Sequence, residues 1–189
     1  MNLIITDAAS QRTPVTRCPR WLAPDEITYS VGKSTLGQLL VARSANGICS
    51  ILIGSEAEEL NSDLATRFLQ STLVRNDRKL RDDLEKVLRF IETPAIGLDL
   101  PLDIHGTPFQ RRVWEELSKI RPGAIITYGA LATRIGEPKA VRAVAGACAA
   151  NAIALAIPCH RVVRSNGTLS RYRWGVERKR ALLEREARA

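Results

Sequence analysis

The sequence lacks any apolar run that approaches the roughly 20 residues of a transmembrane helix, so we expect no membrane span. Residues 1–5 are mostly apolar but carry no basic segment, which argues against a secretory signal. Cysteine is scarce, and none of the four cysteines lies in a Cys-x-x-Cys pair or at zinc-finger spacing. We therefore expect a cytoplasmic protein with free thiols, no bound metal and no cofactor.

The composition is that of a globular protein with an excess of positive charge. Of 189 residues, 45 % are hydrophobic and 25 % are charged, which is enough for one core or for two small lobes that share an interface. Residues 159–189 carry +6 of the net +8 charge, because nine Arg or Lys residues there face three acidic residues. Such a balance favours a polyanionic partner, although net charge alone is a weak signal.

The first half of the chain contains strand-like and helix-like patterns after an irregular start. Residues 1–28 hold three prolines and no clear period, so we expect a leader there. Apolar runs on both sides of Asn46-Gly47 predict a β-hairpin within residues 35–53. Apolar residues recurring every three or four positions predict helices over residues 60–68 and 80–91. Residues 29–97 are therefore the expected amino-terminal α/β lobe.

Beyond a segment with Pro and Gly at residues 93–101, the pattern becomes helical. Thr107-Pro108-Phe109-Gln110 supplies the capping threonine, first-turn proline and capping-box glutamine that open a helix. Further helices are expected over residues 128–135, 139–149 and 176–188. The sequence thus predicts an α+β protein, in which a small lobe with a short β-sheet precedes a helical domain over residues 98–189.

The segment Ile157-Pro158-Cys159-His160-Arg161-Val162-Val163 places a thiol beside one of only two histidines. A cysteine is nucleophilic as its thiolate, which a nearby imidazole or cation stabilises. Taken alone, however, a Cys-His pair is more often a buried thiol next to a surface histidine. The surrounding motifs must decide between a reactive and an inert Cys159.

The helices expected over residues 128–135 and 139–149 are separated by Gly136-Glu137-Pro138, which predicts a helix-turn-helix. The second helix consists almost entirely of small residues, so it is poorly equipped to read base edges in a major groove. Small residues let a helix approach a minor groove closely, and Arg142 is long enough to fill the gap left by an extruded nucleotide. A buried Ala-rich helix with one exposed arginine explains the spacing equally well.

The cysteine motif is accompanied by other short motifs in a fixed order. They are Leu100-Pro101-Leu102-Asp103, Phe109-Gln110, Val113-Trp114, Thr127-Tyr128, Pro138-Lys139-Ala140-Val141-Arg142-Ala143-Val144, Asn151, Tyr172-Arg173-Trp174-Gly175, and Leu182-Leu183 with Glu186. In this combination the chain resembles the 6-O-methylguanine-DNA methyltransferases, in the form found as the carboxyl-terminal half of bacterial adaptive-response proteins. The resemblance implies a ribonuclease-H-like first lobe and a winged-helix-like domain that carries the active site.

The resemblance also implies a role for each matching residue. Cys159 is the alkyl acceptor, His160 draws its proton through a bridging water, and Glu186 orients the imidazole. A bridging water also suits an extended segment, in which neighbouring side chains point apart. Tyr128 helps to rotate the nucleotide and protonates the leaving guanine, and Asn151 is a hinge before the active-site loop. The implied DNA contacts are Tyr128, Lys139, Ala140, Val141, Arg142 and Ala143, and the implied pocket residues are Pro158, Val162, Tyr172, Arg173 and Lys179.

The implied activity is direct reversal of DNA damage by a single-use, irreversible transfer. Cys159 takes a methyl or larger alkyl group from the 6-oxygen of guanine, and the expected partner of the monomer is double-stranded DNA containing alkylated guanine. Ser170-Arg171-Tyr172 departs from the family's usual Ser-Gly-Tyr or Gly-Asn-Tyr, so the range of alkyl groups and activity on 4-O-methylthymine stay open. The alternative is a non-catalytic protein that binds alkylated bases, although such relatives lack the acceptor cysteine.

Overall fold

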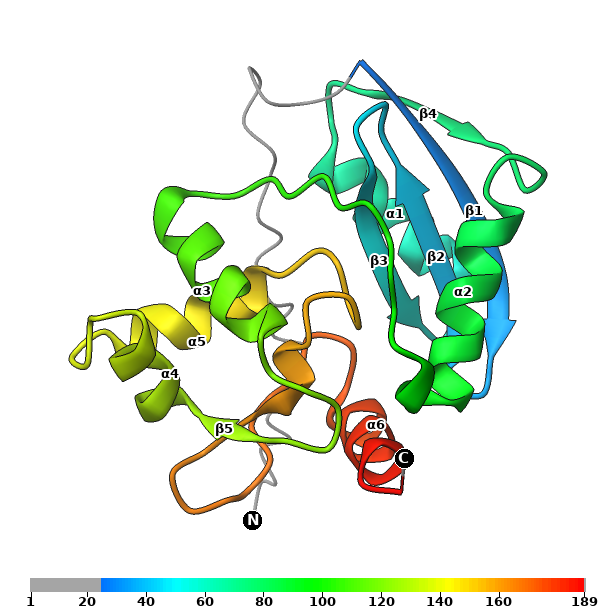
Figure 1. Cartoon of the computed structure of the whole chain (residues 1–189). Helices are drawn as coiled ribbons and strands as arrows, with labels where there is room; N and C mark the ends of the chain where they lie inside the picture. The colour runs from blue at the N-terminus through cyan, green and yellow to red at the C-terminus, as the bar shows by residue number, and fades with distance from the viewer. Residues whose placement is uncertain (1–24, 189) are drawn as a thin grey trace, which may run out of the picture.

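The computed structural model describes residues 25–188, so Cys18 and most of the expected leader lie outside the described residues. A small sheet with two helices precedes a mainly helical domain (Figure 1). The strands are β1 (Glu26–Ser34), β2 (Gly37–Arg43), β3 (Ile48–Gly54), β4 (Thr72–Arg75), β5 (Ile126–Thr127) and β6 (Val162–Val163). The helices are α1 (Ala57–Arg67), α2 (Arg81–Glu92), α3 (Pro108–Ser118), α4 (Tyr128–Arg134), α5 (Val141–Ala150) and α6 (Val176–Glu186), with 3-10 turns η2 (Pro94–Ile96) and η3 (Cys159–Arg161).

The predicted hairpin is confirmed as β2 and β3, which pair antiparallel across the turn at Asn46-Gly47. Gly47 has a φ of 155°, and a Cβ there would lie 2.5 Å from the Pro101 carbonyl oxygen, so this turn requires glycine. β1 and β4 complete a sheet of order β3-β2-β1-β4, in which only the β1–β4 pair is parallel. The sequence pattern did not reveal these two strands, and β1 includes the last residues of the range expected to be a leader.

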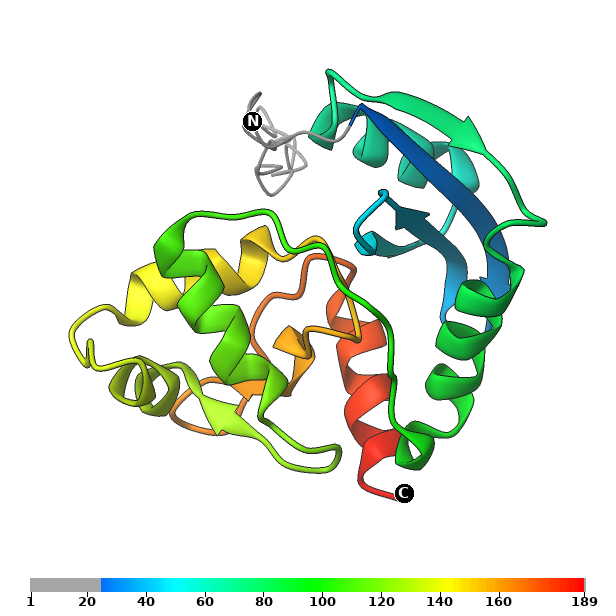
Figure 2. The ribbon, with the colours of Figure 1, turned by 45° about the horizontal axis from the view of Figure 1, so that its top comes forward.

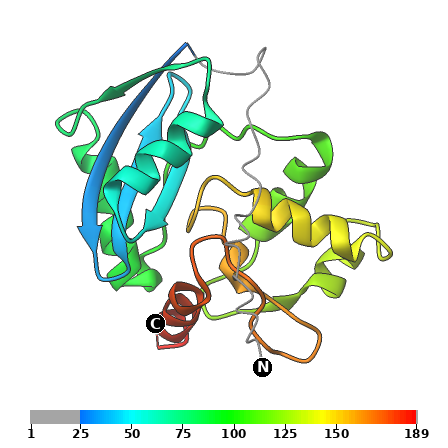
Figure 3. The same cartoon turned by 180° about the vertical axis from the view of Figure 1, so that it is seen from behind.

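Helices α1 and α2 cover opposite faces of the sheet. A Cβ on Gly32 would meet Leu84 of α2, whereas a Cβ on Gly54 would meet Leu60 of α1. By the strand register, Gly32 lies on the same face of the sheet as Leu39, and Gly54 lies on the opposite face. Seen from behind, α1 lies across the near side of the sheet (Figure 3). β3 is buried along its whole length, and α1 packs on one of its faces.

The second domain is built around α3, α4 and α5. The capping box that the sequence predicts at Thr107 is present, since Thr107 Oγ1 accepts from Gln110 N at 3.2 Å and Gln110 Oε1 accepts from Thr107 N at 2.9 Å. Trp114 Nε1 donates to Ala147 O at 2.9 Å and fastens α3 to α5. Gly136, with a φ of 78°, lies in the turn between α4 and α5, the two helices expected to form the helix-turn-helix.

The free edge of β3 joins the two parts of the molecule. Ile48 N donates to Pro101 O at 2.7 Å, and Ile51 exchanges backbone hydrogen bonds with Ala152 and Ala154 at 2.9 and 3.0 Å. A single hydrophobic cluster runs through both parts. Figure 2 shows α6 at the junction, beside the end of α2 and the 3-10 turn η3. Among the described helices, none has the length and apolar character needed to cross a membrane.

Candidate active site

Cys159 and His160 lie in the 3-10 turn η3, between Pro158 and β6. The expectation of an extended segment is wrong, because Arg161 N donates to Pro158 O at 3.0 Å and closes a helical turn. A three-residue turn leaves no periodic trace in a sequence, so the pattern could not reveal it. Cys159 is 4 % exposed and His160 is inaccessible, which excludes the alternative of a surface histidine.

Asn151 holds the loop that leads to the thiol. Its side-chain nitrogen Nδ2 donates to Ile157 O at 2.8 Å and to Cys159 Sγ at 3.2 Å, while its Oδ1 accepts from Ile153 N at 2.9 Å. Asn151 is fully buried at the end of α5, so these bonds are shielded from water. Within the same loop Leu155 has a φ of 70°, a left-handed conformation that costs free energy in a residue with a branched side chain.

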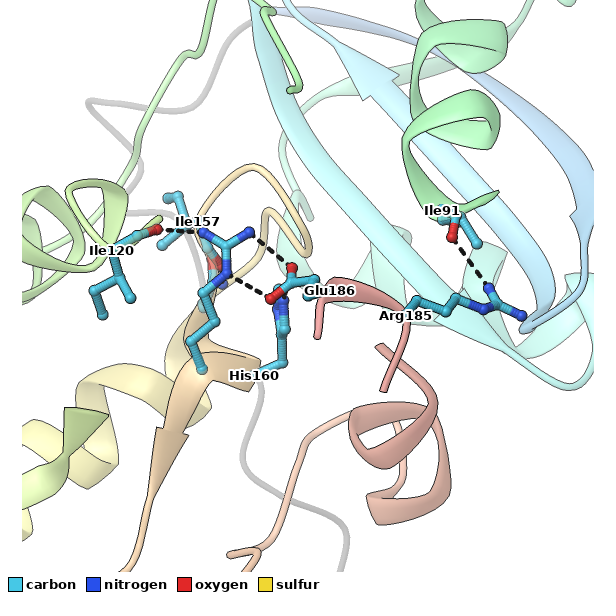
Figure 4. Close-up of polar contacts among 8 residues, drawn as sticks. Ile91, Ile120, Ile157, His160, Arg185 and Glu186 are labelled. Carbon is cyan, nitrogen blue, oxygen red and sulfur yellow. Dashed lines mark hydrogen bonds and ion pairs between the residues drawn. The ribbon is translucent and has the colours of Figure 1, made fainter. Parts of the chain in front are cut away.

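Glu186, the last residue of α6, reaches the turn from 26 positions away. Its carboxylate accepts from His160 Nε2 at 2.8 Å and from Arg161 at 2.7 and 2.9 Å (Figure 4). Arg161 also donates to Ile120 O. All three side chains are buried, so the carboxylate compensates a buried guanidinium as well as orienting the imidazole.

Burial and hydrogen bonds shift the pKa values of these groups in different directions. Burial raises the pKa of Cys159 to about 11, although the Asn151 hydrogen bond and the Lys179 charge oppose the rise. Burial also lowers the pKa of His160, against the opposing effect of Glu186. Burial alone would raise the pKa of Glu186, but hydrogen bonds from His160 and Arg161 outweigh it and lower this pKa to about 2. At neutral pH the resting site therefore holds a thiol, a neutral imidazole and a carboxylate.

Lys179 and Tyr128 meet at Ser170. The fully buried Lys179 Nζ donates to Val162 O and to Ser170 Oγ at 2.9 Å, and Tyr128 OH lies 2.7 Å from the same hydroxyl. Burial raises the pKa of Tyr128 to about 12, against the effect of its bond to Ser170, so the phenol is protonated at neutral pH. Burial lowers the pKa of Lys179, although the nearby thiol groups oppose this effect.

Aromatic side chains surround the imidazole. The buried Tyr172 lies edge-on to His160, with ring centroids 6.4 Å apart, and edge-on to Trp174 at 5.1 Å. Arg173 was expected in the pocket, and the structure pairs its Nη2 with Asp63 of α1 at 2.7 Å. The expected pocket residues Pro158 and Val162 are buried directly beside the 3-10 turn.

Five of the six expected DNA contacts lie at the start of α5 or just before it, and the sixth, Tyr128, is the first residue of α4. Lys139, Val141, Arg142 and Ala143 are exposed, and Ala140 is half-buried. A shallow cavity of about 560 Å³ is lined by residues Glu137, Pro138, Lys139 and Ala140. The exposed face of α5 therefore carries small side chains, Val141 and one cation, Arg142, while Val144, Ala147 and Cys148 face the core.

Two residues that contact the site were missed as functional residues at the level of sequence. Arg161 stands inside the cysteine motif, where an arginine directly before the apolar Val162-Val163 signals a buried ion pair. Ser170 stands in the Ser170-Arg171-Tyr172 motif, but its role could not be predicted, because its partners Tyr128 and Lys179 come from other segments. Within residues 25–188, no group of three or more His, Cys, Asp or Glu residues is placed to hold a metal ion.

Comparison with known proteins agrees with this geometry. Residues 108–188 match the model of the 6-O-methylguanine DNA methyltransferase, DNA binding domain. The methylated-DNA–protein-cysteine methyltransferase of Candida albicans is 36 % identical over 168 residues, which cover 84 % of this chain and 95 % of that protein. The chain belongs to the methylated-DNA–protein-cysteine methyltransferase family. The inducible member from Bacillus subtilis is 37 % identical and is covered over 84 % of its length.

One further sequence relative and one solved structure are similar to this methyltransferase-family chain. The bifunctional transcriptional activator/DNA repair enzyme Ada of Escherichia coli is 48 % identical over 161 residues, and the chain spans only 46 % of that protein. The crystal structure of Mycobacterium tuberculosis OGT in complex with DNA superposes with a TM-score of 0.70 at 30 % identity, over 85 % of this chain and 93 % of that one. The family resemblance and the mixed α+β fold predicted from the sequence are thereby confirmed.

Proposed function

We propose that this protein repairs alkylated DNA by transferring the alkyl group from the 6-oxygen of guanine to Cys159. The observation that carries the proposal is the buried hydrogen bond from His160 to Glu186 at 2.8 Å, directly beside the thiol. The named activity of its relatives supports this assignment. Since the chain spans about half the length of the Ada proteins, the transcriptional activity of Ada is not part of the proposal.

The hydrogen bond to Glu186 sets the proton positions on the imidazole. A carboxylate only accepts, so His160 Nε2 carries the proton and Nδ1 keeps a basic lone pair. Nδ1 is buried and has no hydrogen-bond partner among the described residues. We propose that Nδ1 accepts the proton of Cys159 through a bridging water. The negative charge of Glu186 then stabilises the imidazolium that forms.

The transfer is an in-line displacement. The Cys159 thiolate attacks the alkyl carbon, the carbon–oxygen bond breaks, and its electron pair leaves with guanine. Tyr128 is protonated at neutral pH and can give its proton to the leaving base. The product on Cys159 is a neutral thioether, so the burial that raises the pKa of this thiol also favours the product. No group in the described site is placed to cleave the thioether, and each molecule reacts once.

The start of α5 suits a minor groove. Small residues allow the helix backbone to approach the DNA closely, Lys139 can contact a phosphate, and Arg142 can fill the space of the extruded base. The complex of the tuberculosis relative with DNA supports this proposal. The proposed partner is double-stranded DNA with alkylated guanine, bound by a monomer. Among the described residues, the free thiols Cys148 and Cys159 suit a reducing compartment such as the cytoplasm.

Mass spectrometry of Cys159 tests the proposal. Incubation with a duplex containing 6-O-methylguanine should add about one methylene, ~14 Da, to the peptide with Cys159 and to no other peptide. Cys159→Ser is the matched control and should stay unmodified while still binding the duplex. Binding without any mass change in the wild-type protein would instead support the non-catalytic alternative.

A further inference from the structure

Helix α6 contacts both parts of the molecule through two stripes of residues. Arg178 and Arg185 are seven positions apart, and so are Lys179 and Glu186. Seven residues make almost two whole turns, so each pair lies along one side of the helix, and the two sides differ by about 100°. Lys179 and Glu186 belong to the active site, whereas Arg178 and Arg185 bond to residues of the sheet lobe, which comprises β1 to β4 with α1 and α2.

Arg185 fastens the last turn of α6 to the sheet lobe. Its Nη1 donates to Ile91 O, near the end of α2, at 3.2 Å, and its Nη2 donates to Thr35 Oγ1 at 2.9 Å. Thr35 Oγ1 in turn donates to Glu92 Oε1 at 2.6 Å, so the hydroxyl that accepts from Arg185 is itself held by a hydrogen bond to α2. Figure 4 shows Arg185 directed towards Ile91 while Glu186 is directed towards His160.

Arg178 repeats this arrangement two turns earlier. Its Nε donates to Leu36 O at 2.7 Å, and its Nη2 donates to Ser55 Oγ at 3.1 Å. Its Nη1 donates to Trp174 O at 2.8 Å, which also ties the segment before α6 to the helix. The two arginines therefore fix both the position and the rotation of α6 against the sheet lobe.

The end of α6 needs such a fastening because terminal turns of helices fray. Glu186 is the final helical residue, and its carboxylate must stay within hydrogen-bond distance of His160. We propose that Arg185 is a positioning residue for Glu186. Through Arg185, the sheet lobe then determines how efficiently the proton relay of bridging water, His160 and Glu186 deprotonates Cys159. This inference rests on the proposed function, yet Arg185 itself contacts neither the thiol nor the imidazole in any hydrogen bond of the described residues.

Arg185→Ala in the full chain tests the inference through single-turnover kinetics on a 6-O-methylguanine duplex. A displaced relay should lower the saturating transfer rate at pH 7 by about 10- to 100-fold, because small misplacements of catalytic groups have effects of this order. The protein concentration for half-saturation should stay unchanged. As the pH rises towards 10 the variant should approach the wild-type rate, because hydroxide then deprotonates Cys159 without the relay. Arg185→Lys should restore part of the loss at pH 7.

Arg180→Ala is the matched control. Arg180 carries the same charge on the same helix, but it is exposed, and among the described residues it pairs only with Glu177, at 2.6 Å. It should keep the wild-type rate and pH profile. Thr35→Val removes an Arg185 partner without changing α6, and it should give a smaller loss with the same pH dependence. This variant decides the question if Arg185→Ala does not fold.

The outcomes separate the inference from the proposed function. A wild-type protein that transfers no alkyl group at any pH would overturn the function itself. With an active wild type, the inference fails if Arg185→Ala keeps the wild-type rate, or if its loss is equal at every pH. It also fails if Arg180→Ala shows the same loss, since the effect would then come from net charge.

Discussion

The substitution Glu186→Gln tests two roles of the buried carboxylate, its contribution to the stability of the fold and its part in the proton relay. In the wild-type protein Glu186 compensates the charge of Arg161, which is 4 % exposed, and accepts a hydrogen bond from His160. A glutamine keeps the shape but removes the negative charge. The variant therefore leaves a buried guanidinium without its counter-ion and an imidazolium without its stabilising partner.

Two independent considerations give the size of the loss in stability. Breaking a buried ion pair by removing one partner costs about 3–5 kcal/mol. The pKa of Glu186 is lowered from 4.5 to about 2, which corresponds to about 3 kcal/mol of stabilisation at neutral pH. We expect Glu186→Gln to lower the free energy of unfolding by about 3 kcal/mol at pH 7, or the melting temperature by about 10 °C.

Urea unfolding over a pH series checks both the size and the sign. The folded pKa of Glu186 lies below its unfolded value, so its contribution is complete above about pH 5 and is lost as the pH falls towards 2. The difference between wild type and variant should follow this course. A difference under about 1 kcal/mol at pH 7, or one that is independent of pH, would refute the reasoning.

A second substitution distinguishes stability from chemistry. Arg161→Met in the Glu186→Gln background removes the unpaired cation and should restore most of the stability. It should not restore alkyl transfer, which we expect to stay at least about 100-fold below wild type at pH 7 because the proton relay is missing. Recovery of both properties together would show that Glu186 acts only through the fold.

Two further substitutions test the remaining parts of the site. Arg142→Ala should slow repair of duplex DNA by at least about tenfold while leaving reaction with the free base 6-O-benzylguanine unchanged, and equal losses would contradict the flipping role. Ser170→Ala should lower the free energy of unfolding by about 1–3 kcal/mol, because Lys179 and Tyr128 lose a shared buried partner; chemical denaturation showing no change would mean that the two side chains find other partners.

Local signals account for the elements that the sequence predicted well. The hairpin at Asn46-Gly47, the capping box at Thr107 and the periodic helices all depend on residues within one or two turns of each other. β4 lacked such a signal, since it has four residues and is mostly exposed, whereas the alternation of Ile27, Tyr29 and Val31 in β1 was overlooked. Its pairing with β1 is parallel and joins distant segments, which no local pattern encodes.

The sequence by itself determined the chemical inventory of this protein: the thiol beside a histidine, the small residues around Arg142, and the family to which these motifs belong. Only the tertiary structure decided which of these residues contact one another. It brings Glu186 against His160 and Arg161, joins Tyr128 to Lys179 through Ser170, and fastens α6 to the sheet lobe through Arg185. These partners are between 9 and 150 positions apart in the chain. Long-range hydrogen bonds depend on how packed elements meet, and a linear pattern contains no record of that packing.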